Sequence, residues 1–317
     1  MQNYIIRRIL LAIPTLLIAS SLVFIMIRMA PGDVMLTVLG ESMANTPNKD
    51  IEQVRHDLGL DAPIHVQYMK FIAGVTRGDL GKSLRDKTPV RDEIKDKLPV
   101  TIELAVLALL WSLVIAIPVG VISAIRQDTF LDYLFRSIAV AGISLPSFWL
   151  GTLAIILPAI WFHKIPSVVY TSLMDDPFTN IKQMALPALI LGTLLAGTVM
   201  RITRTMMLEV MRQDYIRTAM AKGLHEKVVI YRHALRNALI PVVTVLGLQV
   251  AFLIGGTVVI ENIFSLPGMG RLFIEALNWR DYPVIQGLNV VVASWVVIVN
   301  IIVDISYGFL DPRIRYS

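Results

Sequence analysis

The uncharged stretch LAVLALLWSLVIAIPVGVISAI, residues 104–125, decides the fold class of this chain. A helix needs about 20 mostly apolar residues to cross the roughly 30 Å of hydrocarbon in a bilayer. Inside lipid, every backbone N–H and C=O group must be paired within its own segment, so a run of this kind forms a helix. The stretch therefore predicts a transmembrane helix.

Five further uncharged runs flank this stretch on both sides. Only 17% of the 317 residues are charged and 55% are hydrophobic, whereas about a quarter of the residues of a soluble domain are charged. We therefore predict an all-α membrane protein with six transmembrane helices, the first of which is a retained anchor. The five runs cover residues 9–27, 137–162, 183–200, 238–260 and 282–303.

Three parts of the chain follow from these runs. Residues 1–29 form an N-terminal transmembrane helix, and residues 30–98 form an extracytoplasmic loop or small helical subdomain. Residues 99–317 form a five-helix core, which includes a cytoplasmic segment at about 212–236. Pro146, in the third run, is expected to kink or break its helix, as are Pro118 and Pro158.

The positions of the cations predict the orientation in the membrane, because Lys and Arg near the ends of spans mark the cytoplasmic side. With six spans, the N-terminus, the second and fourth connections and the C-terminal tail all lie on one side, and all carry such cations. Both termini are therefore predicted to be cytoplasmic. The cations are Arg7, Arg8, Arg126, Arg136, Arg201, Arg204, Arg212, Arg217, Lys222, Lys227, Arg232, Arg236, Arg313 and Arg315.

The long first connection is expected to fold into two short helices. One would place Ile51, Val54 and Leu58 on a single face, and the other would begin at Pro63. The second helix would carry an apolar stripe. Its residues are Ile64, Tyr68, Phe71, Ile72 and Val75.

Neither an enzyme nor a metal site is indicated by the sequence. Gly81-Lys82-Ser83 ends like a phosphate-binding loop, but Thr76 stands where that motif requires glycine. The five histidines show no metal-ligand spacing, there is no cysteine, and no cofactor is expected in this chain. The net charge of +5 does not indicate a nucleic-acid partner, because the cations lie at the ends of spans that cross the lipid bilayer.

Polar residues inside the spans are candidates for a transport pathway. Asn289 and Asn300 lie on one face of the last run, and Gln249 lies in the fifth. Amides are costly against lipid, so these side chains should face protein or a water-filled path. Hydrogen bonding between helices is the alternative explanation. Gly247, Ala251 and Gly255 form a ridge of small residues, for packing within the chain or for a subunit interface.

The connection from residue 212 to residue 236 has the features of a docking element for a cytoplasmic partner. Asp214 is a suitable N-cap and Gly223 a suitable residue to follow a helix end, which predicts a helix of about two turns between them. A second, longer helix would lead into the fifth span. The apolar side of the short helix would be formed by Tyr215, Ile216, Ala219, Met220 and Leu224.

The same connection resembles the coupling segment of binding-protein-dependent ABC importer permeases, whose consensus is Glu-Ala-Ala, three residues, then Gly. Aligned on Gly223, the triplet falls on Arg217, Thr218 and Ala219, and the sequence RTAMAKG is similar to that of the peptide-permease subfamily. Arg217 replaces the acid of the general consensus. Other matching motifs are RRILLAIPTLL (7–17), PVTIELA (99–105), ISLPSFWLG (143–151), NALIP (237–241), FSLPGMGRL (264–272) and DPRIRYS (311–317).

The resemblance implies a type I ABC importer permease of the bacterial inner membrane that forms half of a translocation pathway for di- or oligopeptides. It implies as partners a second homologous permease, two cytoplasmic ATPase subunits that hold ATP and Mg²⁺, and an extracytoplasmic substrate-binding protein. Glutathione and nickel chelates remain alternative cargoes, and a secondary transporter or a receptor scaffold remain alternative functions. The implied coupling residues are Asp214, Arg217, Thr218, Ala219, Lys222, Gly223 and Leu224.

Overall fold

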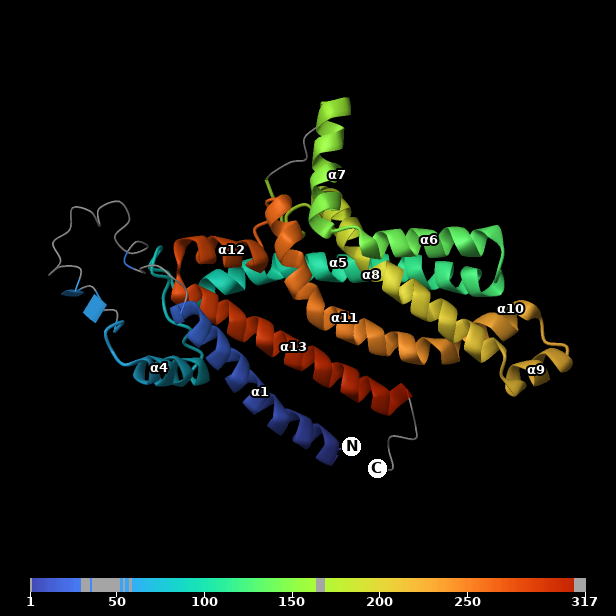
Figure 1. Cartoon of the computed structure of the whole chain (residues 1–317), viewed down its shortest axis with the longest axis horizontal. Helices are drawn as coiled ribbons and strands as arrows, with labels where there is room; N and C mark the ends of the chain where they lie inside the picture. The colour runs from blue at the N-terminus through green and yellow to red at the C-terminus, as the bar shows by residue number, and fades with distance from the viewer. Residues whose placement is uncertain are drawn as a thin grey trace. The chain divides into compact units, whose positions relative to one another are not determined.

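A computed structural model describes residues 2–29, 35, 52–53, 55–56, 59–163 and 169–310 of the chain (Figure 1). Over these residues the structure is helical, apart from turns, loops and an isolated antiparallel bridge between Lys82 and Pro89. Five helices are long and apolar enough to cross a membrane, and they confirm five of the six predicted spans. They are α1 (Gln2–Met29), α5 (Val90–Ile125), α8 (Pro177–Met211), α11 (Arg236–Ile263, which continues the helical residues 226–235) and α13 (Tyr282–Leu310).

The remaining predicted span is a pair of helices rather than one straight rod. Helix α6 (Phe130–Ser144) and helix α7 (Ser147–Phe162) meet at an angle of 97°, and together they bring the number of spans to six if the pair counts as one. The break falls at Pro146, which cannot donate a backbone hydrogen bond and holds the preceding residue in an extended conformation. Helix α5 continues through Pro118 and helix α7 continues through Pro158, so neither of these prolines breaks its helix.

Several spanning helices begin earlier than their apolar runs, α5 and α8 among them. Helix α5 starts at Val90 rather than Leu104, with Asp92 and Glu93 in its first turn, where acidic side chains stabilise the positive end of the helix dipole. Asp176 caps α8 by accepting hydrogen bonds from the backbone N–H groups of Phe178 and Thr179. The hydroxyl of Thr179 also donates to Asp176, at 2.6 Å, and lowers the pKa of that carboxyl.

The contacts within the chain divide it into two units. The first contains Thr101–Leu266 and the C-terminal residues from Ile298, and the second contains Gln2–Val100 and Pro267–Val297.

In the first unit, α8 packs against α6 and α11. Small residues on α8 permit close approach: a Cβ added at Gly192 would lie 2.6 Å from the backbone oxygen of Ala108, and one at Gly197 would lie 2.7 Å from that of Ala139. The unit also contains α9 (Asp214–Ala221), α10 (Glu226–Val228) and the π-helix η2 (Val229–Leu235), which leads directly into α11.

In the second unit, α4 (Ile64–Thr76) begins directly after Pro63 and confirms the second of the two predicted outer helices. Ile51, Val54 and Leu58, which define the first predicted outer helix, lie outside the described residues. Helix α12 (Met269–Trp279) was not predicted.

Residues far apart in the sequence meet in this second unit. Val90 and Ile94 are buried with Leu288 in one apolar cluster. The buried carboxylate of Asp281 accepts hydrogen bonds from the Ser83 hydroxyl, at 2.5 Å, and from the backbone N–H of Leu84. Asp281 therefore holds the loop that precedes α5 against the N-terminus of α13.

Candidate coupling and pathway sites

Helix α9 is the short helix that the sequence predicts between residues 214 and 223. It covers Asp214–Ala221 and is amphipathic. Ile216 and Ala219 are buried in a cluster that includes Met207 of α8 and Val121 of α5. Because its apolar side is packed in this way, α9 is attached to two spanning helices of its own unit.

The C-terminal end of α9 confirms the predicted role of Gly223. This glycine has a φ of +77°, a left-handed conformation that other residues adopt at an energetic cost. Its N–H donates to the carbonyl of Met220 at 2.9 Å, and the N–H of Leu224 donates to the carbonyl of Ala219 at 3.4 Å. This pair of bonds is the Schellman arrangement, in which a glycine ends a helix and satisfies its last carbonyls.

The prediction that Asp214 is the N-cap is wrong. Gln213 occupies the cap position, makes no side-chain cap hydrogen bond, and leaves Asp214 as the first helical residue. At that position the carboxylate still faces the positive end of the helix dipole, which explains why the residue type suits the helix start. Asp214 pairs instead with Arg217 at 3.6 Å, one turn further along the helix.

The outer face of α9 combines apolar and basic side chains. Tyr215, Met220 and Leu224 are 44%, 46% and 42% exposed, although the sequence places them on the same apolar side as the buried Ile216. Arg217, Thr218 and Lys222 are exposed as well. The expected apolar side therefore divides in two, with one part anchoring the helix and the other facing outward.

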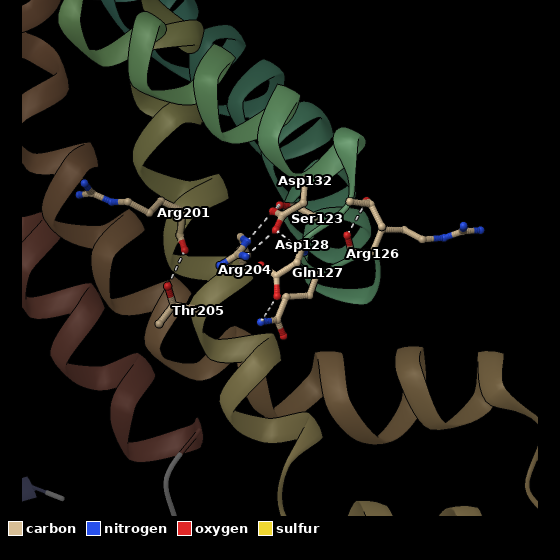
Figure 2. A network of polar contacts seen from close by, with 9 residues as sticks. Ser123, Arg126, Gln127, Asp128, Asp132, Arg201, Arg204 and Thr205 are labelled. Carbon is tan, nitrogen blue, oxygen red and sulfur yellow. Dashed lines mark hydrogen bonds and ion pairs between the residues drawn. The ribbon is translucent and has the colours of Figure 1, made fainter.

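A polar network behind this segment was not predicted (Figure 2). Asp132 at the start of α6 is completely buried, and Arg204 of α8 donates to both of its carboxylate oxygens, at 2.7 and 2.6 Å. The hydroxyl of Ser123, on α5, and the backbone N–H of Asp128 donate to the same carboxylate. The network therefore joins three helices of the first unit.

The sequence contained only a weak signal for this network. Arg204 is one of many cations in the fourth connection, and the positive-inside pattern alone accounts for its presence. Asp132 follows an exposed turn and reads as an ordinary acidic residue near a helix start. Another buried carboxylate, that of Glu261 in α11, was also missed, and it accepts a hydrogen bond from the Thr101 hydroxyl at 2.8 Å.

The three candidate pathway residues lie in different environments. The Oε1 atom of Gln249 and the Nδ2 atom of Asn289 are both buried without a hydrogen-bond partner. Asn300 is exposed. For these two atoms, the described residues provide no hydrogen-bond partner of the kind that the alternative to a pathway role requires.

The ridge of small residues on α11 serves packing within the chain at one end. A Cβ on Gly247 would lie 2.0 Å from Cγ2 of Val303, so α13 approaches α11 closely at this point. Ala251 is buried, whereas no atom lies within 4 Å of a Cβ placed on Gly255. The contact with Val303 thus explains why residue 247 is a glycine, whereas no contact with the described residues explains the small residue at position 255.

Two family models match nearly the whole chain. Residues 116–316 match the binding-protein-dependent transport system inner membrane component, and residues 1–105 match the N-terminal model of the same transport-system membrane component. The chain belongs to this family. The permease is therefore a multi-pass protein of the bacterial cytoplasmic membrane, and its described residues contain five helices, or six if the bent pair counts as one, that could span it.

Full-length relatives agree with this assignment. The permease is 40% identical to the dipeptide transport system permease protein DppB of Alkalihalophilus pseudofirmus and to that of Escherichia coli, over 100% of each chain. It is 42% identical to a putative peptide transport system permease protein of Brucella abortus, again over 100% of both chains.

A solved structure supports the fold. The inward-facing MetNI methionine ABC transporter has a chain that aligns with the permease with a TM-score of 0.56 and 14% identity, covering 69% of the permease and 96% of that chain. This similarity confirms the type I importer architecture expected from the resemblance, and at this identity it concerns the fold alone.

Proposed function

We propose that this permease forms half of the translocation pathway of an ABC importer for di- or oligopeptides. It pairs with a second homologous permease, receives its cargo from an extracytoplasmic binding protein and is driven by two cytoplasmic ATPase subunits that bind ATP and Mg²⁺. Full-length relatives that are 40–42% identical and are named for dipeptide or peptide transport support the cargo class.

The observation that carries the coupling role is the division of α9 into a buried and an exposed side. Ile216 and Ala219 fix the helix to α5 and α8, so a force applied to α9 is transmitted to spanning helices. Tyr215, Met220 and Leu224 leave an apolar surface facing outward, where a partner can bury it. An element with these two sides is suited to transfer a rigid-body movement from a cytoplasmic partner to the membrane helices.

In this proposal each coupling residue has a distinct task. Gly223 ends the helix and leaves space for close approach, since no atom of the described residues other than its two chain neighbours lies within 4 Å of a Cβ placed there. Arg217, Lys222 and Thr218 supply polar contacts at the rim, and Leu224 extends the apolar surface. Asp214 orients Arg217 through their ion pair. Ala219 keeps α9 close to the spans.

For the pathway we propose roles for Gln249, Asn289 and Asn300. The buried and unpaired amide atoms of Gln249 and Asn289 are available to a polar solute or to water. Asn300 exposes its amide on the same helix as Asn289.

Transport by purified components tests the function. The permease, its partner permease and the two ATPase subunits are reconstituted in proteoliposomes, with the binding protein added on the outside. We expect uptake of a radiolabelled dipeptide that requires ATP and the binding protein, together with faster ATP hydrolysis when the binding protein is loaded. Uptake driven by an ion gradient without ATP would identify a secondary transporter. Hydrolysis unaffected by loaded binding protein, with no uptake, would favour a receptor or scaffold.

Competition in the same assay defines the cargo. Unlabelled di- and tripeptides are expected to reduce uptake, and glutathione and a nickel chelate are expected to have no effect at equal concentration. Stronger competition by glutathione or by the nickel chelate would contradict the peptide assignment.

A further inference from the structure

The second unit contains a cavity of about 330 Å³ that lies outside the proposed coupling segment and the three proposed pathway residues. It lies where the C-terminal end of α1, the helix α4 and the N-terminal end of α13 meet. Cavities of roughly 300–1,000 Å³ hold small organic ligands. In the predicted topology this end of α1 faces the extracytoplasmic side, since Arg7 and Arg8 mark the other end as cytoplasmic.

The principal cation of the cavity is Arg28, and its side chain is firmly oriented. Its Nε and NH2 atoms donate to Oε1 of Gln67, at 3.0 and 2.7 Å. The amide nitrogen of Gln67 donates in turn to the backbone carbonyls of Leu60 and Ala62, at 3.1 and 2.8 Å. These bonds determine which end of the Gln67 amide faces Arg28, and they fix the guanidinium without a carboxylate.

Aromatic rings hold the same guanidinium from other directions. Its central carbon lies 3.6 Å from the centre of the Phe24 ring and 5.9 Å from that of Tyr282. Phe24 stacks on Phe71 of α4 and packs edge-on against Tyr68. Contacts between a guanidinium and aromatic faces position the cation and leave its in-plane N–H groups available.

Two donors at this cavity have no acceptor within the described part of the chain. The NH1 atom of Arg28 is buried without a hydrogen-bond partner, and so is the Nε2 atom of Gln286. Gln286 is 6% exposed, so its amide is almost completely enclosed. Buried polar groups are nearly always paired in folded proteins, so two such donors at one cavity indicate an acceptor that binds there.

The remaining groups at the cavity favour an anion as that acceptor. Lys70 lies on its exposed side, and no described carboxylate pairs with it. His56 also lines the cavity, and its Nε2 atom lies 3.9 Å from a carboxylate oxygen of Asp61, which is not among the lining residues. The apolar part of the wall is provided by Phe24, Phe71, Leu60 and Leu84.

We propose that this cavity binds a carboxylate group whose neighbouring carbon atoms pack against the apolar wall. The planar guanidinium of Arg28 presents N–H donors in a geometry that matches the two oxygens of a carboxylate, with Gln286 as a further donor. The apolar wall receives the group that carries the carboxylate. The ligand is either a small organic acid from the outer solution or an acidic side chain of the binding protein when it docks. This site lies outside the coupling segment and the three pathway residues.

The first experiment measures binding of a defined small acid. Radiolabelled N-acetyl-phenylalanine and its uncharged C-terminal amide are added to the assembled importer in nanodiscs, with empty nanodiscs as the control for partition into lipid. The acid is expected to bind in preference to the amide. Arg28→Gln is expected to weaken binding of the acid at least tenfold, and Gln286→Met, which keeps the volume and removes the donor, several-fold. Arg77→Gln is the matched control, because it removes an exposed cation at the end of α4 that does not line the cavity.

The second experiment measures association of the binding protein with the same variants. If N-acetyl-phenylalanine does not bind but Arg28→Gln and Gln286→Met both weaken this association relative to Arg77→Gln, the carboxylate belongs to the binding protein. Equal binding of acid and amide, together with unchanged association in every variant, would overturn the proposal. If Arg28→Gln fails to assemble, Gln286→Met decides the outcome in both experiments. Dipeptide uptake by the wild-type importer is recorded in parallel, so a failure of this site is distinguished from a failure of the transport function.

Discussion

Arg204 and Asp132 form a two-point ion pair between α8 and α6, with Nε 2.7 Å from Oδ1 and NH2 2.6 Å from Oδ2. Asp132 is fully buried and the side chain of Arg204 is only 15% exposed, so neither charge is well solvated by water. Ser123 adds a bond from α5. The three helices are thereby joined beside the segment that carries α9, and this gives α9 a rigid support.

Breaking this ion pair should destabilise the permease more than an exposed charge change does. Asp132→Asn leaves Arg204 largely buried without a carboxylate, a change that typically costs about 3–5 kcal/mol. Thermal unfolding of the purified complex should therefore begin at a lower temperature in this variant. Asp128→Asn is the matched control, because it removes an exposed carboxylate from the same turn. Equal unfolding temperatures for the two variants would show that the pair contributes nothing to stability.

A side chain at Gly223 should impair transport chiefly because it would obstruct the close approach of an ATPase subunit. Its φ of +77° makes any Cβ cost roughly 1 kcal/mol, but the chain itself leaves the space around it empty. Gly223→Val is expected to insert normally yet to lose ATPase association or to hydrolyse ATP without uptake, and Gly223→Ala is expected to be milder. Copurification of the ATPase subunits and dipeptide uptake at equal protein amounts measure both effects.

Gly78 provides the control for that experiment. It has a φ of +76° and equally open surroundings, but it lies in the loop after α4. Gly78→Val therefore introduces the same backbone strain far from α9 in the sequence, and ATPase association should be unchanged. Wild-type coupling in Gly223→Val would disprove the docking role of this residue.

The orientation in the membrane can be measured directly because the chain has no cysteine. Met174 is 94% exposed in the connection before α8, and the side chain of Asp214 is 96% exposed at the start of α9. In intact cells Met174→Cys should react with a membrane-impermeant thiol reagent, whereas Asp214→Cys should react only after the cells are opened. The reverse pattern would place α9 outside the cell, where ATPase subunits cannot reach it.

The close contact between Gly247 and Val303 should make α11 sensitive to a single methyl group. Gly247→Ala places a Cβ 2.0 Å from Cγ2 of Val303, and overpacking of this kind typically costs about 1–3 kcal/mol. Val303→Ala in the same chain should restore much of the lost thermal stability, because it removes the two methyl groups of Val303 that lie closest. Gly255→Ala is the control, since its Cβ meets no atom of the chain. If Val303→Ala does not restore the thermal stability of the Gly247→Ala variant, the methyl groups of Val303 are not the cause of its destabilisation.

Several features were predictable because their causes are local in the sequence. Lipid forces an uncharged run to pair its backbone within itself, so the positions of α1, α5, α8, α11 and α13 follow from composition. The end of α9 at Gly223 was equally predictable, because glycine adopts the left-handed conformation at little cost. The break at Pro146 follows from the missing N–H of proline.

Helix ends that depend on polar residues were less predictable. The N-cap of α9 was misplaced by one residue, since an acidic side chain suits both the cap and the first helical position. The first turns of α5 contain charged residues, so the apolar run that predicted this helix begins only at Leu104, whereas the helix itself begins at Val90.

The sequence by itself determined that this chain spans a membrane, the approximate positions of five spanning helices and which short segment resembles a docking element, because each depends on neighbouring residues. Only the tertiary structure decided which polar residues meet. Arg204 and Asp132 are 72 positions apart, and Arg28 and Gln286 come from opposite ends of the chain. The packing of the helices decides that Arg204 pairs with Asp132, and that Arg28 and Gln286 each keep one buried donor without an acceptor. A single sequence carries no local signal for contacts at that separation.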